Sequence, residues 1–175
     1  MSVRHIIIYP DPILATVAQP VTFPLSHRVT TLISDMAETM YDAPGVGLAA
    51  PQVGASLRIA ITDTIWRNEE NKKTDTRHLQ VWINPVFTWK SEQTSIYEEG
   101  CLSVPETYEE VERPSAIRLR WQDEQGSTHE SEFEGFMATA LQHEFDHLDG
   151  RLFVDYLSPL KRRMIVKRMK KHFIE

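Results

Sequence analysis

The chain has 175 residues, 41% of them hydrophobic and 25% charged, which suits one globular domain with a sizeable core. Its apolar runs are too short to cross a membrane, its first residues lack the pattern of a signal or transit peptide, and its one cysteine excludes an internal disulfide framework. We therefore expect a single domain over residues 1–175, located in the cytoplasm and without membrane contact.

The net charge of −6 is distributed unevenly along the chain. Residues 161–175 hold seven lysines and arginines against one glutamate, a net of +6, which leaves −12 on residues 1–160. A basic C-terminal segment of this kind is either the solvated face of a packed helix or a surface that docks on nucleic acid.

The N-terminal half predicts an arm, a helix and a turn-prone segment. Residues 1–24 contain four prolines and indicate an extended arm that wraps the body. Residues 26–42 predict a helix with one apolar stripe, formed by Val29, Leu32, Ile33, Met36, Ala37, Met40 and Tyr41. Pro44 and Gly45 end it.

The segment GVGLAAPQVG (45–54) is small, apolar and turn-prone. It neither follows a predicted strand nor opens a helix, so it is a poor candidate for a phosphate-binding loop. It is either a buried connection that permits close packing or a glycine-lined ledge along which a peptide backbone can approach. The sequence alone favours neither interpretation.

Most of the remaining chain predicts strands. Residues 57–62, 79–87 and 96–104 read as extended, 67–77 as an exposed polar loop, and 116–122 and 127–134 as a hairpin. Pro85 would restrict its strand to an edge or an end of a sheet. The resulting fold class is α+β, with antiparallel strands around a central helix near residues 136–149, a helix before them, and a last helix from Pro159.

The central helix carries the motif His-Glu-x-x-His. His143 and His147 are four residues apart, so on a helix both rings can reach one metal ion. Glu144 lies beside the ion and can accept a proton from water there. The alternative to a metal site is that the two histidines lie one helical turn apart on a polar face by chance. Two protein ligands also leave a catalytic site of the zinc type one short.

Downstream of the motif, only Asp149 and Asp155 remain as candidates for the third ligand, and they are weak ones. Phe153 occupies the place where one protease pattern has a histidine, and the only later glutamate is Glu175. Asp149 and Asp155 are too close in sequence to swing easily around the ion. Upstream, Cys101 is the best candidate, because a thiolate binds first-row metals strongly and Cys-His-His leaves a position open for water. A lone cysteine is otherwise usually a small buried hydrophobe.

Three complete segments then make the pattern specific: GVGLAAPQ (45–52), EGCLS (99–103) and QHEFDH (142–147). In order and spacing they resemble the three motifs of the peptide deformylases, and the resemblance spans nearly the whole chain. It implies hydrolytic removal of the N-formyl group from the formyl-methionine of nascent polypeptides, with release of formate. The implied metal ligands are Cys101, His143 and His147, and the implied catalytic groups are Glu144, the Gln52 amide and the Leu102 N–H.

The resemblance also implies a metal, a methionine pocket and a partner. The family usually works with Fe2+, and Zn2+, Ni2+ or Co2+ can substitute. Gly45, Gly47, Val46, Phe136, Thr139 and Ala140 are the expected substrate-binding residues. Some members have an arginine shortly after the second motif that meets the substrate, but here no arginine lies between that motif and Arg113. Glu99 could orient a ligand histidine or pair with Arg113. We expect a monomer whose residues 161–171 dock on the ribosome.

Two functions from other classes compete with this hypothesis. A metal-dependent peptidase would share the motif but lacks its downstream ligand here. A non-catalytic metal-binding domain would not need Glu144. A paralogue with relaxed specificity stays compatible with the sequence.

Overall fold

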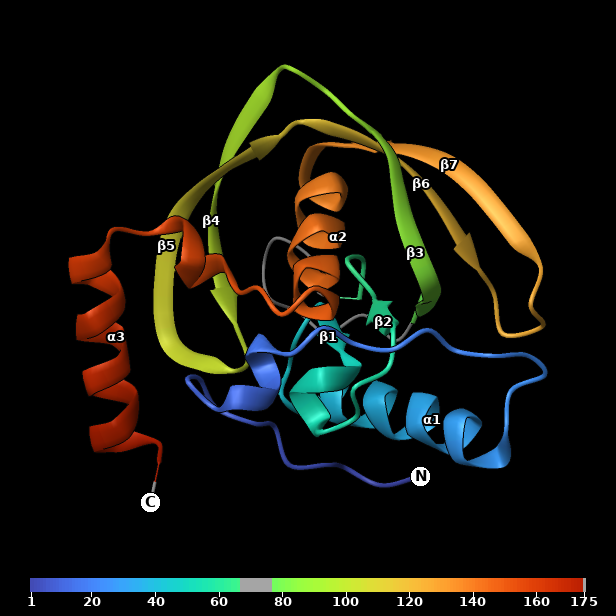
Figure 1. The fold of residues 1–175 in the computed structure, drawn as a ribbon, viewed down its shortest axis with the longest axis horizontal. Coiled ribbons are helices and arrows are strands. Elements are labelled where there is room, and N and C mark those ends of the chain that lie inside the picture. The colour runs from blue at the N-terminus through green and yellow to red at the C-terminus, as the bar shows by residue number, and fades with distance from the viewer. Residues whose placement is uncertain (67–76, 175) are drawn as a thin grey trace.

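The computed structural model describes residues 1–66 and 77–174. Three α-helices and seven strands cover most of this part of the chain (Figure 1). They are α1 (His27–Asp42), β1 (Gly47–Ala49), β2 (Ile59–Thr62), β3 (Gln80–Lys90), β4 (Thr94–Cys101), β5 (Val104–Pro114), β6 (Ala116–Gln122), β7 (Thr128–Glu134), α2 (Gly135–Leu148) and α3 (Pro159–His172).

The strands form a five-stranded sheet and a separate hairpin. The sheet has the order β1-β2-β3-β6-β7 with antiparallel neighbours, and β4 pairs with β5. Helix α2 lies between β3, β6 and β7 on one side and the β4–β5 hairpin on the other (Figure 1). Trp82 and Leu119 of the sheet belong to the same buried cluster as Leu141 and Phe145 of α2. The predicted α+β architecture around a central helix is confirmed.

Helix α1 forms where the apolar stripe predicts it. Ser26 caps its N-terminus by accepting a hydrogen bond from the Val29 N–H at 3.3 Å. Met36 and Met40 are fully buried against β1 and β2. Helix α1 ends at Asp42, shortly before the segment 45–54. This segment contains β1 and a short 3-10 helix, Ala50–Val53. Of the two interpretations of this segment, close packing fits residues 48–53, all of which are buried.

Strand β3 differs from its prediction. It lies in the middle of the sheet, so the expectation that Pro85 confines its strand to an edge or an end is wrong. The pairing with β2 stops at Ile83, and the register with β6 shifts between Ile83 and Val86. Pro85 falls in this irregularity, where its missing N–H interrupts no regular ladder. The predicted polar loop 67–77 lies, except for its last residue, outside the described residues.

The N-terminal arm binds two of the motif segments and the end of the helix that carries the third. The Ile7 N–H donates to the Gln52 carbonyl at 2.8 Å, and the Tyr9 N–H donates to the Ser103 carbonyl at 2.9 Å. Further along, the Ala18 N–H donates to the carbonyl of Leu148 at the end of α2 at 2.9 Å. These backbone bonds make the arm a strap that fixes the motifs relative to one another.

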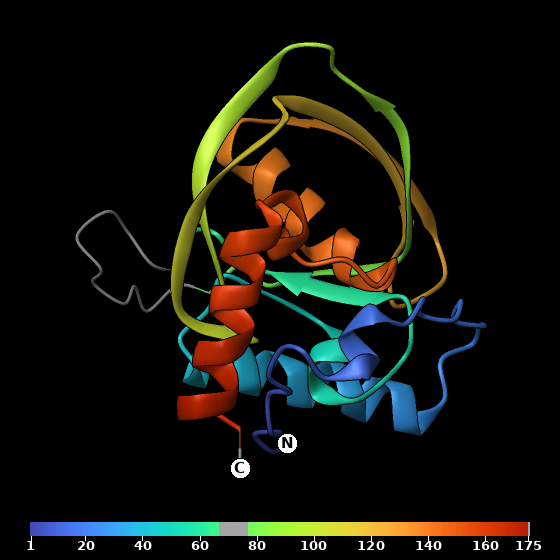
Figure 2. The same ribbon diagram turned by 60° about the vertical axis from the view of Figure 1, so that its left-hand side comes forward.

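Helix α3 packs on the outside of the molecule, beside β5 (Figure 2). Ile165 and Met169 are its buried residues, and Phe173 is partly buried in the same cluster, as the apolar spacing predicts. Its cations stay at the surface. Two of them contact β5: Lys161 pairs with Glu109 at 3.0 Å, and Arg168 donates to the Thr107 hydroxyl.

Candidate metal-centred active site

Helix α2 places the two motif histidines one above the other. The ring centroids of His143 and His147 are 5.3 Å apart, and both side chains are buried. The helix ends at Leu148, and Gly150 follows with φ of +75°. A side chain at Gly150 would collide with the arm, since its Cβ would lie 2.7 Å from the Ala15 carbonyl carbon. The glycine therefore permits both the helix stop and the strap.

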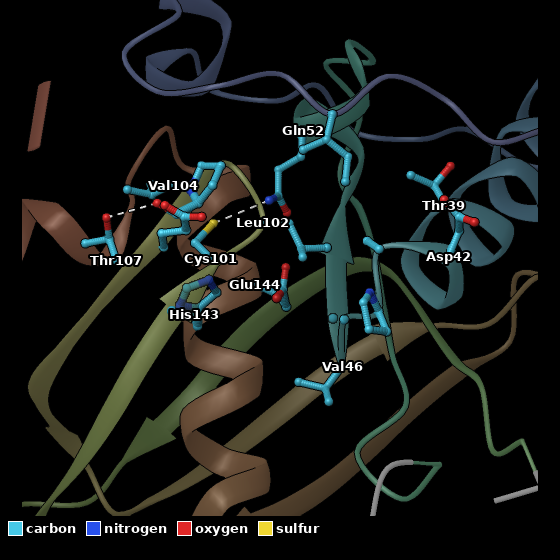
Figure 3. Close-up of a pocket in the computed structure, with 18 of the residues that line it drawn as sticks. Thr39, Asp42, Val46, Gln52, Cys101, Leu102, Val104, Thr107, His143 and Glu144 are labelled. Atoms are coloured by element: carbon cyan, nitrogen blue, oxygen red, sulfur yellow. Dashed lines mark hydrogen bonds between the residues drawn. The ribbon is translucent and has the colours of Figure 1, made fainter. Parts of the chain in front are cut away.

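Cys101 comes to the histidines from the end of β4. A tight turn pairs Cys101 with Val104 and brings its Sγ to 3.5 Å from His147 Nε2 (Figure 3 shows Cys101 beside His143). One ligand atom each from Cys101, His143 and His147 lie within 4.8 Å of one another. Tetrahedral coordination needs such atoms about 3.3 to 3.8 Å apart. The three side chains therefore fit a divalent metal after small adjustments.

The ring of His147 is suited to this role because it is neutral. Burial lowers its pKa well below the ordinary value, and the charges of His143 and Arg113 act in the same direction. Its Nδ1 is buried and has no hydrogen-bond partner among the described residues, while Nε2 faces Cys101. A neutral ring with its proton on Nδ1 leaves the Nε2 lone pair available to a metal.

A buried ion pair orients His143. Its Nδ1–H donates to Glu99 Oε1 at 2.9 Å, and the guanidinium of Arg113 holds the same carboxylate with two bonds of 2.7 and 2.9 Å. Burial alone would raise the pKa of Glu99, but the bonds from His143 and Arg113 outweigh it and lower the pKa. Glu99 thus stays ionised, fixes the tautomer of His143 and turns Nε2 toward the site. From the sequence, pairing with His143 and pairing with Arg113 looked like alternatives; Glu99 does both.

The network continues away from the site. Arg113 also donates to Asp146 Oδ2 at 2.8 Å, and the Tyr156 hydroxyl donates to the same oxygen at 2.8 Å. Arg113 is 3% exposed, so its charge depends on these partners. Burial, the largest cause, acts to lower the pKa of Arg113, but Glu99 and Asp146 reverse this and keep it fully charged.

Protonation of His143 reflects the same neighbours. Burial acts against a charge on the ring, but the hydrogen bonds to Cys101 and Glu99 prevail and raise its pKa. Metal binding requires the unprotonated Nε2, so loading this site releases a proton and weakens as pH falls.

Glu144 is buried beside the ligands and has an adjustable charge. Burial is the main cause that raises its pKa to about 7, and its Oε2 has no hydrogen-bond partner among the described residues. Gly47 makes room for this carboxylate, because a Cβ at position 47 would lie 2.8 Å from Glu144 Cδ. A carboxyl group with a pKa near neutrality and a free oxygen is suited to move protons.

Gln52 presents an N–H to the same space. Its Oε1 accepts from the Ala49 N–H at 2.9 Å, which sets the orientation of the amide. The Nε2 then points to Ser103 Oγ at 3.1 Å and to Cys101 Sγ at 3.4 Å (Figure 3). Gln52 is 1% exposed, so this donor is held rigidly.

These groups share one cavity of about 710 Å³. Its walls include Gln52, Cys101, Leu102, His143 and Glu144, and the segment 45–47 runs along it (Figure 3). Arm residues 3–6 and the start of β5 form other parts of the wall. A buried acid–base group, an amide donor and two members of the three-ligand cluster, Cys101 and His143, line one cavity, and the third member, His147, is buried next to Cys101. These are the elements of a metal-dependent hydrolase.

Comparison with known proteins agrees with this geometry. The polypeptide deformylase family model matches residues 3–163. The peptide deformylase of Rhizorhabdus wittichii is 52% identical over 171 residues, which cover 98% of this chain and 96% of that protein. The crystal structure of a peptide deformylase from Legionella pneumophila is 42% identical, with a TM-score of 0.86 and coverage of 97% and 95%. The peptide deformylase of Ehrlichia chaffeensis in complex with actinonin is 34% identical, with a TM-score of 0.89 and full coverage of both chains.

The chain belongs to the polypeptide deformylase family. Membership confirms the predicted enzyme class, a hydrolase that removes the N-formyl group from nascent polypeptides. It also confirms metal dependence as a family property, to which the Cys-His-His cluster corresponds. Among the described residues, no helix is both long and apolar enough to cross a membrane.

The predicted substrate-binding residues fall into two groups. Gly45, Val46 and Gly47 line the cavity. Three others, Phe136, Thr139 and Ala140, lie on α2 but do not line the cavity described above. Thr139 and Ala140 are buried, and Phe136 is half-exposed with its ring centroid 6.0 Å from that of Tyr97. A role for these three in a methionine pocket stays a prediction.

Sequence reasoning missed two parts of the deformylase site. Asp146 and Tyr156 support Arg113, and the arm residues 3–6 line the cavity. Asp146 lies between the two motif histidines, so an acid there was a usable signal for a second ion pair. The arm carries no such signal, because its place in the cavity wall depends on backbone bonds to distant segments.

Proposed function

We propose that Cys101, His143 and His147 hold the catalytic metal and that Glu144, Gln52 and the Leu102 N–H catalyse deformylation. The observation that carries this proposal is that three ligand atoms lie within 4.8 Å of one another, next to a cavity that the buried Glu144 carboxyl and the Gln52 amide donor line. Residues 1–175 act together as one catalytic domain, since the arm bonds to two motif segments and to Leu148, directly after the third.

Glu144 moves the proton in both halves of the reaction. As a carboxylate it accepts a proton from the water that attacks the formyl carbon. It then donates this proton to the departing amine nitrogen, so that the C–N bond breaks and formate and a free N-terminus leave. Burial raises the pKa of Glu144 to about 7, so its carboxylate is a stronger base than an ordinary one.

Gln52 and the backbone N–H of Leu102 stabilise the oxygen of the formyl group. Negative charge develops on this oxygen when water attacks, and preorganised donors lower the energy of that state. The Ala49 N–H holds the Gln52 amide so that Nε2, not Oε1, faces the site. Leu102 directly follows the ligand Cys101, which places its N–H at the same end of β4.

The ion itself is proposed to be Fe2+, in line with the usual metal of the family, with Zn2+, Ni2+ or Co2+ as substitutes. When bound, it supplies Lewis acidity and makes water nucleophilic at neutral pH. One thiolate and two imidazoles suit several first-row metals, so the ligand set supports this group of ions without selecting one. Metal analysis of protein purified without oxygen tests the choice.

The substrate is proposed to lie along the segment 45–47 with its methionine directed toward α2. Gly45 and Gly47 lack side chains that would block a peptide backbone, and Val46 supplies an apolar contact. Phe136, Thr139 and Ala140 provide the wall of the methionine pocket. Specificity for formyl over acetyl follows from a tight site, since acetyl adds a methyl group.

The decisive experiment measures formate release from formyl-methionyl peptides by anaerobically prepared protein. The same peptides without the formyl group are incubated in parallel, and cleavage of their peptide bonds is followed. Formate release without peptide cleavage supports the proposal. Cleavage of unblocked peptides would instead identify a peptidase, and no turnover by protein with a full metal content would identify a non-catalytic metal-binding domain.

The basic helix supports a proposal about location. Residues 161–171 hold seven cations, and among the described residues only Ile165 and Met169 of α3 are buried, so a wide cationic face is available to ribosomal RNA. We place the enzyme in the cytoplasm as a monomer that meets nascent chains at the ribosome. Lys/Arg→Glu changes in 161–171 should abolish co-sedimentation with ribosomes; unchanged co-sedimentation contradicts docking. Sedimentation velocity tests the monomer.

A further inference from the structure

The segment 45–47 forms one wall of the cavity and lies in close contact with catalytic elements. A Cβ at Gly47 would lie 2.8 Å from Glu144 Cδ, and a Cβ at Gly45 would lie 2.8 Å from Leu102 Cδ1. The segment therefore touches the proposed acid–base residue at one end and the residue of a proposed oxyanion donor at the other. A small displacement of this segment changes how a peptide fits along it.

Only one end of the segment belongs to a strand. Gly47 is the first residue of β1 and is paired with Thr62 of β2. Gly45 and Val46 precede β1, so the regular ladder does not fix them. Individual hydrogen bonds therefore decide where the backbone of these two residues lies.

The carbonyl groups of both residues accept hydrogen bonds from the residues that follow β2. The Asp63 N–H donates to the Val46 carbonyl at 2.9 Å, and the indole Nε1–H of Trp66 donates to the Gly45 carbonyl at 2.9 Å. Neither Asp63 nor Trp66 lines the cavity, so both hold the segment from behind. Among the described residues, Trp66 supplies the only side-chain hydrogen bond to segment 45–47.

The indole of Trp66 is itself held firmly. It is 3% exposed and packs edge-on against the Tyr41 ring, with ring centroids 5.1 Å apart and an interplanar angle of 88°. Asp63 accepts hydrogen bonds from the Trp66 backbone N–H at 3.1 Å and from the Tyr41 hydroxyl at 2.6 Å. One carboxylate thus fixes both rings, and the Gly45 carbonyl has a donor with a defined position.

We propose that Trp66 is a positioning residue whose indole N–H fixes the Gly45 end of segment 45–47 and thereby supports binding of the peptide beyond the formyl-methionine. This inference rests on the proposed function, in which the substrate lies along this segment. Since the Gly47 end lies against Glu144, the Gly45 end meets the part of the peptide that follows the methionine. Gly45 is buried, so loss of the indole N–H leaves its carbonyl without a partner and displaces the segment.

The test uses Trp66→Phe, which keeps an aromatic ring against Tyr41 but removes the N–H donor. KM for formyl-Met-Ala-Ser should rise by roughly 3- to 10-fold with kcat nearly unchanged, because peptide binding weakens while the catalytic groups stand on other elements. For formyl-methionine amide, which has no residue after the methionine, KM should change by less than about 2-fold. Trp66→Leu, a second variant without the donor, should raise KM for formyl-Met-Ala-Ser at least as much.

Trp82→Phe is the matched control. Trp82 is also buried and donates its indole N–H, in this case to the Thr62 hydroxyl at 3.0 Å, and it has no hydrogen bond to segment 45–47. This variant should lose stability in urea to a similar extent as Trp66→Phe, because each loses one buried hydrogen bond, and should keep the wild-type KM for both substrates.

The proposal is overturned if the folded Trp66 variants keep the wild-type KM for formyl-Met-Ala-Ser, or if Trp82→Phe raises this KM as much. It is also overturned if KM rises equally for the two substrates, or if kcat falls while KM stays constant, since a general loss of stability would act in that way. Failure of the wild type to release formate from either substrate would instead contradict the proposed function. Circular dichroism spectra confirm that each variant is folded.

Discussion

Helices α2 and α3 have the same length, 14 residues, but opposite relations to solvent. In α2 eleven residues are buried, among them Gln142, His143, Glu144, Asp146 and His147. In α3 only Ile165 and Met169 are buried, and its cations are solvated. Both helices are rich in polar residues. The difference is that Gln142, His143 and Asp146 of α2 form hydrogen bonds with residues of other elements, which offset the free-energy cost of their burial.

The largest effect that this contrast predicts is on catalysis. Glu144→Gln keeps the size of the buried side chain but removes its ability to accept and return a proton. We expect kcat/KM for formyl-methionyl peptides to fall by roughly 1,000-fold, within the usual range for a lost general acid–base group. Steady-state formate release measures it. Glu109→Gln, which removes an acid paired with Lys161 of α3, is the control, and equal activities of the two variants would refute the role of Glu144.

The second prediction concerns the stability supplied by the network behind α2. Arg113→Met leaves the carboxylates of Glu99 and Asp146 buried without their cation. Breaking a buried pair in this way costs about 3 to 5 kcal/mol of unfolding free energy. Urea unfolding should show that loss, while Arg118→Met, which breaks an exposed pair with Glu132, should change stability by less than about 1 kcal/mol. Similar losses in both variants would erase the distinction between buried and solvated charges.

The third prediction separates the two functions of the Gln52 amide. Gln52→Glu keeps an acceptor for the Ala49 N–H but replaces the donor Nε2 with an oxygen. Loss of one oxyanion donor typically lowers kcat by about 100-fold or more. We expect that loss in both Gln52→Glu and Gln52→Ala, with near-normal substrate binding, when kcat and KM are measured separately. Wild-type kcat in Gln52→Glu would show that only the acceptor matters.

Features of α2 and its surroundings that depend on residues close in sequence could be predicted, whereas those that depend on distant residues could not. The motif spacing identified His143, Glu144 and His147, and the apolar stripe predicted α1, because helical periodicity is a local property. The interior position of β3 was missed, since the break in pairing around Pro85 depends on two other strands. For α2, the number of polar residues in its sequence would have predicted a half-exposed helix.

The network around Glu99 was only half predicted for the same reason. Glu99, Arg113 and Asp146 are distant in sequence and come together through the β4–β5 hairpin and α2. A single sequence gives each of them several possible partners. The folded structure brings one set of partners together. In that set, Glu99 accepts a hydrogen bond from the Nδ1–H of His143, which leaves Nε2 of His143 for the metal site.

The fourth prediction extends the contrast to a buried acid outside α2. Asp63 accepts hydrogen bonds from the Tyr41 hydroxyl and from the N–H groups of Ile65, Trp66 and His78. Burial acts to raise its pKa, but these bonds prevail and lower the pKa below the ordinary value. Its stabilisation is therefore present above the unfolded pKa near 3.9 and is lost as pH falls through the lower folded pKa.

Asp63→Asn should accordingly destabilise the protein by roughly 1 to 3 kcal/mol at pH 7, because the amide turns an N–H₂ toward some of these donors. Urea unfolding of both proteins at neutral and acidic pH measures the difference, which should narrow below about pH 4. A difference that stays constant with pH would mean that the charge of Asp63 contributes nothing.

The smallest effect belongs to the exposed cations of α3. Lys167→Gln and Arg163→Gln remove solvated charges, so each should change the free energy of unfolding by less than about 0.5 kcal/mol. Met169→Ala, on the buried stripe of the same helix, should cost roughly 2 to 5 kcal/mol in the same urea titration and shows that α3 is packed. If the lysine and arginine variants lost as much stability as Met169→Ala, the cations would be structural, and a basic face kept free for ribosomal RNA would no longer explain them.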